Sequence, residues 1–339
     1  MPRPILKPLR LQTIALTGAT SGIGLATARL AASRGAKLLL IARNEDALVA
    51  LRDELRAGGA QADYAVADVS DRAQLEAAAA KAQEVFGGID SWVNDAGAFA
   101  YGALDVIPLE DQRRLFEVVY WGTVHGTLVA ASALKGRGGA IVNVGSVLGE
   151  FAIPFQGAYC AAKFAVKGFT EAFRRELASR REPISVSLIK PAAIDTLFME
   201  HGRNLIGAPG TRNPPPAYHP HLVARAILHA CEHPVRDLVV GGAGGLSLVI
   251  GNRLAPRLMD LVLGAIGRQT QSTSNPGIQA RRDNLFEPRE DGAERSSLHP
   301  FTRKTSLALE AQLHPAATLA AAAGLGVLLL GAAALRRRP

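Results

Sequence analysis

The stretch Thr17-Gly18-Ala19-Thr20-Ser21-Gly22-Ile23-Gly24 directly follows a short apolar run at residues 14–16. A segment rich in Ala, Leu and Arg comes next and is typical of a helix. Glycines permit a tight turn and let the backbone approach a pyrophosphate, whose charge is favoured at a helix N-terminus. This order of strand, turn and helix predicts a dinucleotide-binding unit. The glycine spacing differs from the usual G-x-G-x-x-G, and a purely structural turn is the alternative.

Outward from this stretch, short apolar runs alternate with amphipathic segments. The predicted strands are residues 14–16, 38–42, 65–66, 92–93, 141–144, 186–189 and 238–240. The clearest predicted helices are residues 45–56, 72–86 and 111–133. This alternation predicts right-handed βαβ units. We therefore expect an α/β fold, a Rossmann-like doubly wound parallel sheet with helices on both faces.

Composition narrows the class of protein. The chain has 339 residues, of which 48% are hydrophobic and 20% charged, as in an ordinary globular protein. The net charge of +8 is dispersed, without a basic stripe interleaved with aromatic residues, which argues against nucleic-acid binding. Cys160 and Cys231 form no ligand-like cluster and suggest no disulfide framework, so a cytoplasmic environment is expected. His125 and His201 also lack partners for a metal site, and no metal is expected.

Three regions are predicted along the chain. Residues 1–243 form the catalytic domain, and residues 244–315 form a helical and polar extension. Within the extension, residues 246–266 are expected to cover a substrate cleft or to lie on a membrane surface, and residues 269–303 to form a linker or loosely ordered arm.

The third region, residues 316–335, is a twenty-residue stretch without charge, followed by three arginines. Such a stretch would span about 30 Å as a helix, which is the thickness of a bilayer core. It is predicted to be a transmembrane or membrane-interface helix, with the catalytic domain in the cytoplasm. The positive-inside tendency disfavours a span, since it would place the arginines on the far side. A buried or disordered Ala-rich helix, or packing against residues 246–266, is the alternative.

Lys163 lies four positions after Tyr159, so a helix would place them on one side, one turn apart. A phenol has a reference pKa of about 10, and a neighbouring ammonium favours its ionised form. Ser146 lies thirteen residues before the tyrosine and could hold a substrate oxygen beside it. The three residues predict an acid/base site that interconverts an alcohol and a carbonyl.

Several residues after the predicted strands suit a nicotinamide dinucleotide. Arg43 follows the second strand, where an arginine suits a 2′-phosphate, so NADP(H) is expected in preference to NAD(H); a solvated surface arginine is the alternative. Asp68 and Val69 follow the third strand, and Asp68 could bind adenine. A tight turn beside the cofactor is expected after the fourth strand, at Asn94, Asp95, Ala96 and Gly97.

Together these motifs resemble the short-chain dehydrogenase/reductase family over roughly residues 11–240. The resemblance rests on Thr-Gly-x-x-x-Gly-x-Gly, Asp-Val, Asn-x-Ala-Gly, Ser and Tyr-x-x-x-Lys in the family's order. It implies that Tyr159 is the general acid/base, that Lys163 lowers its pKa and binds the nicotinamide ribose, and that Ser146 polarises the carbonyl. It also implies cofactor contacts from Ile194 and Thr196, in a segment similar to the family's Pro-Gly-x-x-x-Thr, and a homodimer or homotetramer. The implied cofactor-binding set is Gly18, Thr20, Ser21, Gly22, Ile23, Gly24, Arg43, Asp68, Val69, Asn94, Ala96, Gly97, Tyr159, Lys163, Ile194 and Thr196.

The sequence departs from the family's pattern at Val119. This residue occupies the position of an asparagine that helps to relay protons from the lysine in the family. Valine has no side-chain hydrogen-bonding group, so the relay is expected to be rerouted or impaired. Ala192 and Asp95 are milder departures, at positions where glycine and asparagine are common.

Apolar residues near the strand ends predict an apolar substrate. They are Phe99, Tyr101, Leu148, Phe151, Ile153, Phe155, Phe198 and Met199. Core or lid packing of about half of them is the alternative. The expected function is an NADP(H)-dependent oxidoreductase acting on an apolar alcohol and its ketone or aldehyde. A non-catalytic, membrane-tethered NADP(H) sensor or scaffold is the alternative.

Overall fold

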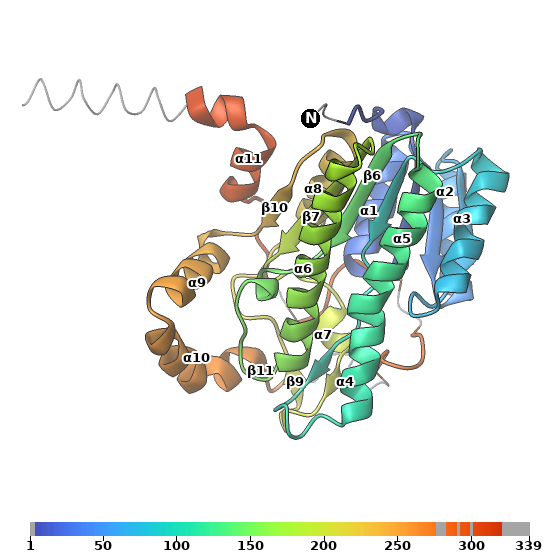
Figure 1. Cartoon of the computed structure of the whole chain (residues 1–339). Coiled ribbons are helices and arrows are strands. Elements are labelled where there is room, and N and C mark those ends of the chain that lie inside the picture. The colour runs from blue at the N-terminus through green and yellow to red at the C-terminus, as the bar shows by residue number, and fades with distance from the viewer. Residues whose placement is uncertain (1–3, 276–282, 290–291, 299–300, 321–339) are drawn as a thin grey trace, which may run out of the picture.

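The computed structural model describes residues 4–275, 283–289, 292–298 and 301–320 (Figure 1). Its centre is a seven-stranded sheet in the order β10-β7-β6-β4-β1-β2-β3, with every pairing parallel. The strands are β1 (Thr13–Thr17), β2 (Lys37–Ala42), β3 (Ala62–Val66), β4 (Ser91–Asn94), β6 (Gly139–Val144), β7 (Ile184–Pro191) and β10 (Asp237–Val240). All seven predicted strands are confirmed, as is the doubly wound α/β fold.

Helices cover both faces of this sheet. They are α1 (Gly22–Ser33), α2 (Glu45–Ala57), α3 (Arg72–Phe86), α4 (Leu109–Phe116), α5 (Gly122–Leu134), α6 (Gly157–Ser179) and α8 (Pro220–Glu232). Strand β2 shows why both faces of the sheet must be covered. Leu38 and Leu40 belong to the core on one face, beneath α1, α2 and α8. Leu39 and Ile41 belong to the core on the other face, beneath α3 to α6. Alternate side chains of a strand point to opposite faces, so a continuous apolar run produces a strand buried on both.

The predicted helix at residues 111–133 contains a π-helical turn, η2 (Glu117–Trp121), between α4 and α5. Val119 lies in this turn and is fully buried in the core. Its carbonyl oxygen accepts a hydrogen bond from Thr123 Oγ1 at 2.8 Å. Val119 therefore contributes packing at the position where the family pattern has a polar side chain.

Two helices after the sheet form a lid, α9 (Ala243–Leu254) and α10 (Pro256–Gln271) (Figure 1). Pro256 begins the second helix, a position where proline is favoured, so the apolar segment 246–266 forms two helices and not one. Residues of this segment line the cavity described below. The short strands β9 (Gly210–Thr211) and β11 (Ser272–Thr273) pair antiparallel after the lid.

Several short elements connect these parts. They are η1 (Leu9–Leu11), β5 (Ala100–Tyr101), η3 (Val147–Gly149), α7 (Phe198–His201) and β8 (Arg203–Asn204). Strand β5 pairs with β8, which fixes the segment after β4 against the segment after β7.

The prediction of a loosely ordered linker at residues 269–303 is wrong for its described part. Residues 283–289 and 292–298, here called the arm, pack against the carboxyl end of the sheet. Leu285 is fully buried, and Arg295 forms an ion pair with the buried Asp195 at 2.7 Å. The polar residues of this arm make specific contacts with the catalytic domain and are not simply solvated.

The described chain ends near helix α11 (Leu307–Leu313), which lies against β10 and α8. Leu309 and Leu313 join the core there. Gln312 accepts a hydrogen bond from the Val239 amide and donates one to the Val239 carbonyl, both at 2.9 Å. The extension therefore completes the edge of the sheet at β10.

In the described ranges, no helix is long and apolar enough to cross a membrane. Most of the predicted membrane helix at 316–335 lies outside the described residues, from residue 321 onward.

Candidate functional site

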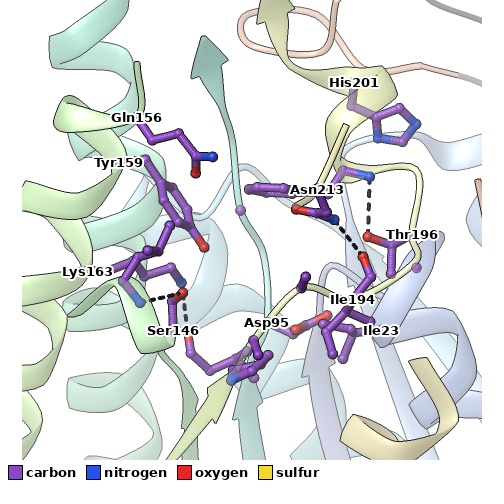
Figure 2. Close-up of a pocket in the computed structure, with 18 of the residues that line it drawn as sticks. Ile23, Asp95, Ser146, Gln156, Tyr159, Lys163, Ile194, Thr196, His201 and Asn213 are labelled. Atoms are coloured by element: carbon purple, nitrogen blue, oxygen red, sulfur yellow. Dashed lines mark hydrogen bonds between the residues drawn. The ribbon is translucent and has the colours of Figure 1, made fainter. Parts of the chain in front are cut away.

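A cavity of about 620 Å³ opens at the carboxyl ends of the sheet strands. One end is lined by Arg43 and Asp68, and the other by Ser146, Tyr159 and Lys163. Figure 2 shows Tyr159, Lys163 and Ser146 on one wall, with Ile194, Thr196 and Asn213 across from them. In open α/β sheets, ligands bind in this crevice outside the carboxyl ends of the strands.

The glycine-rich turn forms one side of the cavity, and its glycines are required by close backbone contacts. Gly18 has a φ of +72°, and a Cβ there would lie 2.9 Å from the Ala96 backbone. A Cβ on Gly24 would lie 2.0 Å from the Gly18 carbonyl oxygen. Side chains are therefore excluded where a phosphate would approach the start of α1, and the turn fits a dinucleotide.

The fold brings Ser146, Tyr159 and Lys163 together from two elements. Ser146 follows β6 and caps η3, where its Oγ accepts a hydrogen bond from the Leu148 amide at 3.0 Å. Tyr159 and Lys163 lie one turn apart on α6. Lys163 Nζ donates to the Val144 carbonyl at 2.7 Å and lies 5.6 Å from the centroid of the Tyr159 ring.

Burial controls the ionisation of this group. It raises the pKa of Tyr159, and the hydrogen bond from the Ser146 hydroxyl opposes that rise. It lowers the pKa of Lys163 to about 8, opposed by the negative charge of Asp95. The expected lowering of the Tyr159 pKa by Lys163 is not seen, because burial of the phenol dominates. The protein alone therefore holds Tyr159 as a neutral phenol.

Asp95 is a site residue whose role the sequence did not reveal. It lines the cavity, and burial raises its pKa to about 8 against the opposing effects of Lys163 and of a hydrogen bond from the Gly24 amide. The sequence showed Asp95 only as a replacement for a common asparagine. Its proximity to Lys163 depends on β4 and α6, whose residues are far apart in the chain.

The cavity wall contains most of the residues predicted to bind the cofactor. Besides Tyr159 and Lys163 they are Gly18, Thr20, Ser21, Gly22, Ile23, Arg43, Asp68, Val69, Ala96, Gly97, Ile194 and Thr196. Gly24 and Asn94 are not part of the lining of this cavity. Asn94 accepts a hydrogen bond from Trp92 Nε1 and donates to Asn143 Oδ1, both at 2.8 Å. It therefore joins neighbouring strands in the core.

Arg43 and Asp68 have protein partners in addition to their place in the cavity wall. Arg43 donates to the carbonyl oxygens of Asn284 at 2.5 Å and Phe286 at 2.8 Å, both in the arm. Asp68 accepts hydrogen bonds from Arg114 and from the Ser70 hydroxyl. The two Arg43 contacts join regions more than 200 residues apart, so the local sequence did not predict the arm's contribution.

Across the cavity, the segment after β7 is held in place by side chains. Asn213 Nδ2 donates to the Ile194 carbonyl at 2.9 Å, and Thr196 Oγ1 accepts from the Phe198 amide at 3.3 Å (Figure 2). Thr196 thus holds the turn that leads into α7. Asn213 was not predicted, because no motif surrounds it.

The predicted apolar wall is divided between the cavity and the core. Leu148, Phe151, Ile153 and Phe198 line the cavity. The other members, Phe99, Tyr101, Phe155 and Met199, are not part of its lining; Phe99, for instance, packs edge-on against Tyr159 with ring centroids 5.3 Å apart. The lid adds apolar lining residues: Leu248, Leu263 and Ile266.

A buried polar cluster lies beside Tyr159, one helical turn earlier. Gln271 Oε1 accepts hydrogen bonds from the Tyr101 hydroxyl and from Gln156 Nε2, both at 2.6 Å. Gln156 and Gln271 line the cavity, so this end is not entirely apolar. The cluster was not predicted, because Gln271 reaches it from the lid.

No group of three or more His, Cys, Asp or Glu residues within the described ranges could hold a metal ion. His201 lines the cavity, and His125 Nδ1 lies 3.1 Å from the Val69 carbonyl oxygen.

Comparison with known proteins agrees with the fold and site. The family model described as short chain dehydrogenase matches residues 12–204. The chain is 38% identical over 322 residues to the uncharacterized oxidoreductase YxnA of Bacillus subtilis, covering 94% of this chain and 90% of that protein. This protein belongs to the short-chain dehydrogenase/reductase family, and it is an oxidoreductase of that family.

Solved structures give the same result. A short-chain dehydrogenase/reductase from Burkholderia phymatum in complex with NAD is 29% identical, with a TM-score of 0.68 over 75% of this chain and 96% of its own. A short-chain dehydrogenase from Burkholderia cenocepacia in complex with NADP is 26% identical, with a TM-score of 0.63 over 76% of this chain and 99% of its own.

Proposed function

We propose that this protein is an NADP(H)-dependent oxidoreductase that interconverts an apolar alcohol and its ketone or aldehyde. The observation that carries the proposal is one continuous cavity with Arg43 at one end and Ser146, Tyr159 and Lys163 at the other. When bound, the nicotinamide ring supplies or accepts a hydride. The residues expected to hold the cofactor are the glycine-rich turn, Arg43, Ile194, Thr196 and Lys163.

Tyr159 is the proposed proton donor and acceptor. Its neutral phenol, favoured by burial, suits proton donation to a carbonyl oxygen during reduction. We expect the Ser146 hydroxyl to donate a hydrogen bond to the same oxygen. In the reverse direction, the hydrogen bond from Ser146 favours the phenolate that accepts the alcohol proton.

A preference for NADP(H) is proposed from Arg43. Its guanidinium has five N–H donors and uses two for arm carbonyls, so it keeps donors for a 2′-phosphate. One solved relative binds NAD and another NADP. Arg43→Asp is expected to reverse the preference, measured as the ratio of NADPH to NADH dissociation constants. An unchanged ratio would refute this role.

The proposed substrate is apolar, with a polar group near its reacting carbon. Leu148, Phe151, Ile153 and Phe198 from the catalytic domain, together with Leu263 and Ile266 from the lid, line the cavity. A mostly apolar wall with a few convergent polar groups is typical of small-molecule sites. A lipid-, steroid- or retinoid-like alcohol or ketone would meet these requirements.

Tyr159→Phe tests the mechanism. The variant keeps the ring and its packing against Phe99 but has no hydroxyl proton to transfer. We expect turnover with a panel of apolar carbonyls to fall by about 10²-fold or more, while NADPH affinity stays within about twofold. Equal turnover would refute the mechanism. Wild-type protein that binds NADPH but oxidises it with no carbonyl would favour the sensor or scaffold instead.

We further propose that the catalytic domain lies in the cytoplasm, that residues 316–335 attach the protein to a membrane, and that it forms a homodimer or homotetramer. The uncharged stretch supports attachment, as do the exposed side chains of Leu254 and Leu261 on the lid, which are 80% and 73% exposed. Deleting residues 316–339 is expected to move the protein from the membrane to the soluble fraction. An unchanged distribution would contradict this attachment.

A further inference from the structure

The arm is fixed to the catalytic domain by two buried carboxylates. Asp195 and Glu200 lie after β7 and are 0% and 1% exposed. Arg295 Nε and Ser296 Oγ both donate to the Asp195 carboxylate at 2.7 Å, and the Ser297 amide donates to Glu200 Oε1 at 2.9 Å. Buried carboxylates need such partners, because an unpaired buried charge is very costly. The docked position of the arm is therefore built into the fold.

The arm also contacts the opposite side of the cavity, at the glycine-rich turn and the end of β2. The Gly22 amide donates to the Ala293 carbonyl at 3.0 Å, and Arg29 pairs with Glu294 at 2.8 Å. Arg43 donates to the Asn284 and Phe286 carbonyls, as described above. The arm thus crosses the cavity from the segment after β7 to the segment after β2.

Arg289 by itself contacts both sides of the cavity. Its carbonyl oxygen accepts a hydrogen bond from Asn44 Nδ2 at 3.1 Å, on the β2 side. Its Nη1 donates to the Glu200 carbonyl at 2.7 Å, on the β7 side. Arg289 also lines the cavity, together with Asn284 and Pro288 of the arm. Its side chain is therefore anchored at α7 and its backbone beside the start of α2, on either side of the cavity.

A dinucleotide phosphate in this space needs positive charge. A phosphate monoester carries about two negative charges near neutrality, and a pyrophosphate adds more. The Lys and Arg residues among the described lining are Arg43, Lys163 and Arg289. Lys163 lies at the Tyr159 end, and Arg43 is assigned above to the 2′-phosphate. Arg289 is the remaining cation at the phosphate end.

We infer that Arg289 is a cofactor-binding residue, supplied by the C-terminal arm, that contacts a phosphate of the bound nicotinamide dinucleotide. This inference rests on the proposed function. The arm would then form the outer wall of the cofactor site, and Arg295, Ser296 and Ser297 would position Arg289 through Asp195 and Glu200.

The test is a direct binding titration, with no turnover required. Arg289→Gln removes the charge and keeps a hydrogen-bonding side chain, and Arg289→Lys keeps the charge without the planar fork. The control is Arg257→Gln, since Arg257 is exposed on α10 and does not line the cavity. Dissociation constants for NADPH and NADH are measured by fluorescence titration at several salt concentrations. The melting temperature of each cofactor-free variant reports on folding.

For Arg289→Gln, the dissociation constant for NADPH is expected to rise about tenfold or more and to depend less on salt, because one charged hydrogen bond is lost. Arg289→Lys should fall between this variant and wild type, and Arg257→Gln should match wild type. A loss for NADPH alone would assign the contact to the 2′-phosphate, and an equal loss for NADH would assign it to the pyrophosphate.

Two results would overturn the assignments, and they are distinguishable. If Arg289→Gln binds both dinucleotides within twofold of wild type, the role of Arg289 is refuted while the proposed function stands. If wild-type protein binds neither NADPH nor NADH, the proposed function itself fails. If Arg289→Gln does not fold, the comparison of Arg289→Lys with the wild-type protein decides. An NADPH affinity and a salt dependence of Arg289→Lys equal to those of the wild type would indicate charge-dependent binding. An NADPH affinity that does not depend on salt in either protein would refute it.

Discussion

Asp95 and Lys163 place a carboxyl group and an ammonium group in the same cavity. Burial raises the pKa of Asp95 to about 8 and lowers that of Lys163 to about 8, so each group depends on the other for its charge. The family pattern commonly has an uncharged asparagine in place of Asp95. This protein therefore carries an additional titratable group beside its catalytic lysine, and the charge of Lys163 depends on it.

Asp95→Asn should make cofactor binding more sensitive to alkali. Lys163 is an ammonium below its pKa of about 8 and loses its charge as the pH rises through that value. Removing the carboxylate removes the attraction that raises this pKa, so the charge is lost at a lower pH. The dissociation constant for NADPH, measured from pH 6 to pH 9, should begin to rise at lower pH than in wild type. A midpoint that stays or moves upward would contradict the coupling.

Gly24→Ala is expected to destabilise the turn without removing a cavity contact. The new Cβ would lie 2.0 Å from the Gly18 carbonyl oxygen, so the backbone must move. Strain of this kind typically costs about 1–3 kcal/mol of the free energy of unfolding. Denaturant unfolding measures this free-energy cost. Gly168→Ala is a matched control, because Gly168 also lies in a helix and a Cβ added there meets no atom within 4 Å. Equal stability of the two variants would contradict this account of Gly24.

At the scale of single residues, the sequence predicted those whose chemistry is carried by a local motif. The glycine-rich turn, Ser146, Tyr159 and Lys163 belong to this group. Gln156, Asn213 and Arg289 were not predicted, since each reaches the cavity through partners distant in the chain. The motif that contains Asn94 marks the turn after β4, while the Asn94 side chain itself forms hydrogen bonds in the core.

The lid helices α9 and α10 relate the extension to substrate choice. Leu263 and Ile266 face the cavity, whereas Leu258 on the same helix is 59% exposed and does not line it. One amphipathic helix thus presents apolar residues both to the cavity and to the outside. Each face can be tested separately.

Leu263→Ala should weaken binding of a bulky apolar substrate. Removing buried methyl groups costs about 1–3 kcal/mol in contact energy, which corresponds to a rise in KM of about 5- to 150-fold. The dissociation constant for NADPH should not change, because Leu263 belongs to the lid. Leu258→Ala is the control and should leave KM unaltered. An equal KM for all three proteins would show that α10 does not contact the substrate.

At the scale of elements, strands were predictable because buried parallel strands form continuous apolar runs. The break at Pro256 and the π-helical turn at residues 117–121 were missed, since both interrupt an otherwise regular helical pattern. The arm was predicted wrongly for another reason. Its polar composition resembles a linker, and only the buried carboxylates of Asp195 and Glu200 show why it is fixed.

For the whole molecule, helix α11 joins the end of the described chain to the core of the catalytic domain. Leu309 packs in the same core as α1 and α8, and Arg225 on α8 pairs with Glu310 at 2.6 Å. The extension is thus part of the folded unit, and its loss should affect the entire domain.

Ending the chain after residue 305 should lower the melting temperature and increase aggregation. Burying Leu309 and Leu313 contributes about 1.5–3 kcal/mol each, and this contribution is lost. Ending the chain after residue 320 retains α11 and is the matched control. Thermal unfolding and light scattering measure both effects. If the shorter chain were as stable and as monodisperse as the control, α11 would have no structural role.

The contacts of Gln312 with Val239 have a consequence for assembly. Strand β10 is the edge of the sheet, and an exposed edge can pair with a second copy to form one continuous sheet across two subunits. In this protein the Gln312 side chain already satisfies both backbone groups of Val239, and α11 covers the strand beside it. Pairing of β10 with the same strand of a second subunit is therefore blocked at Val239, and contact through this edge of the sheet would have to involve α11.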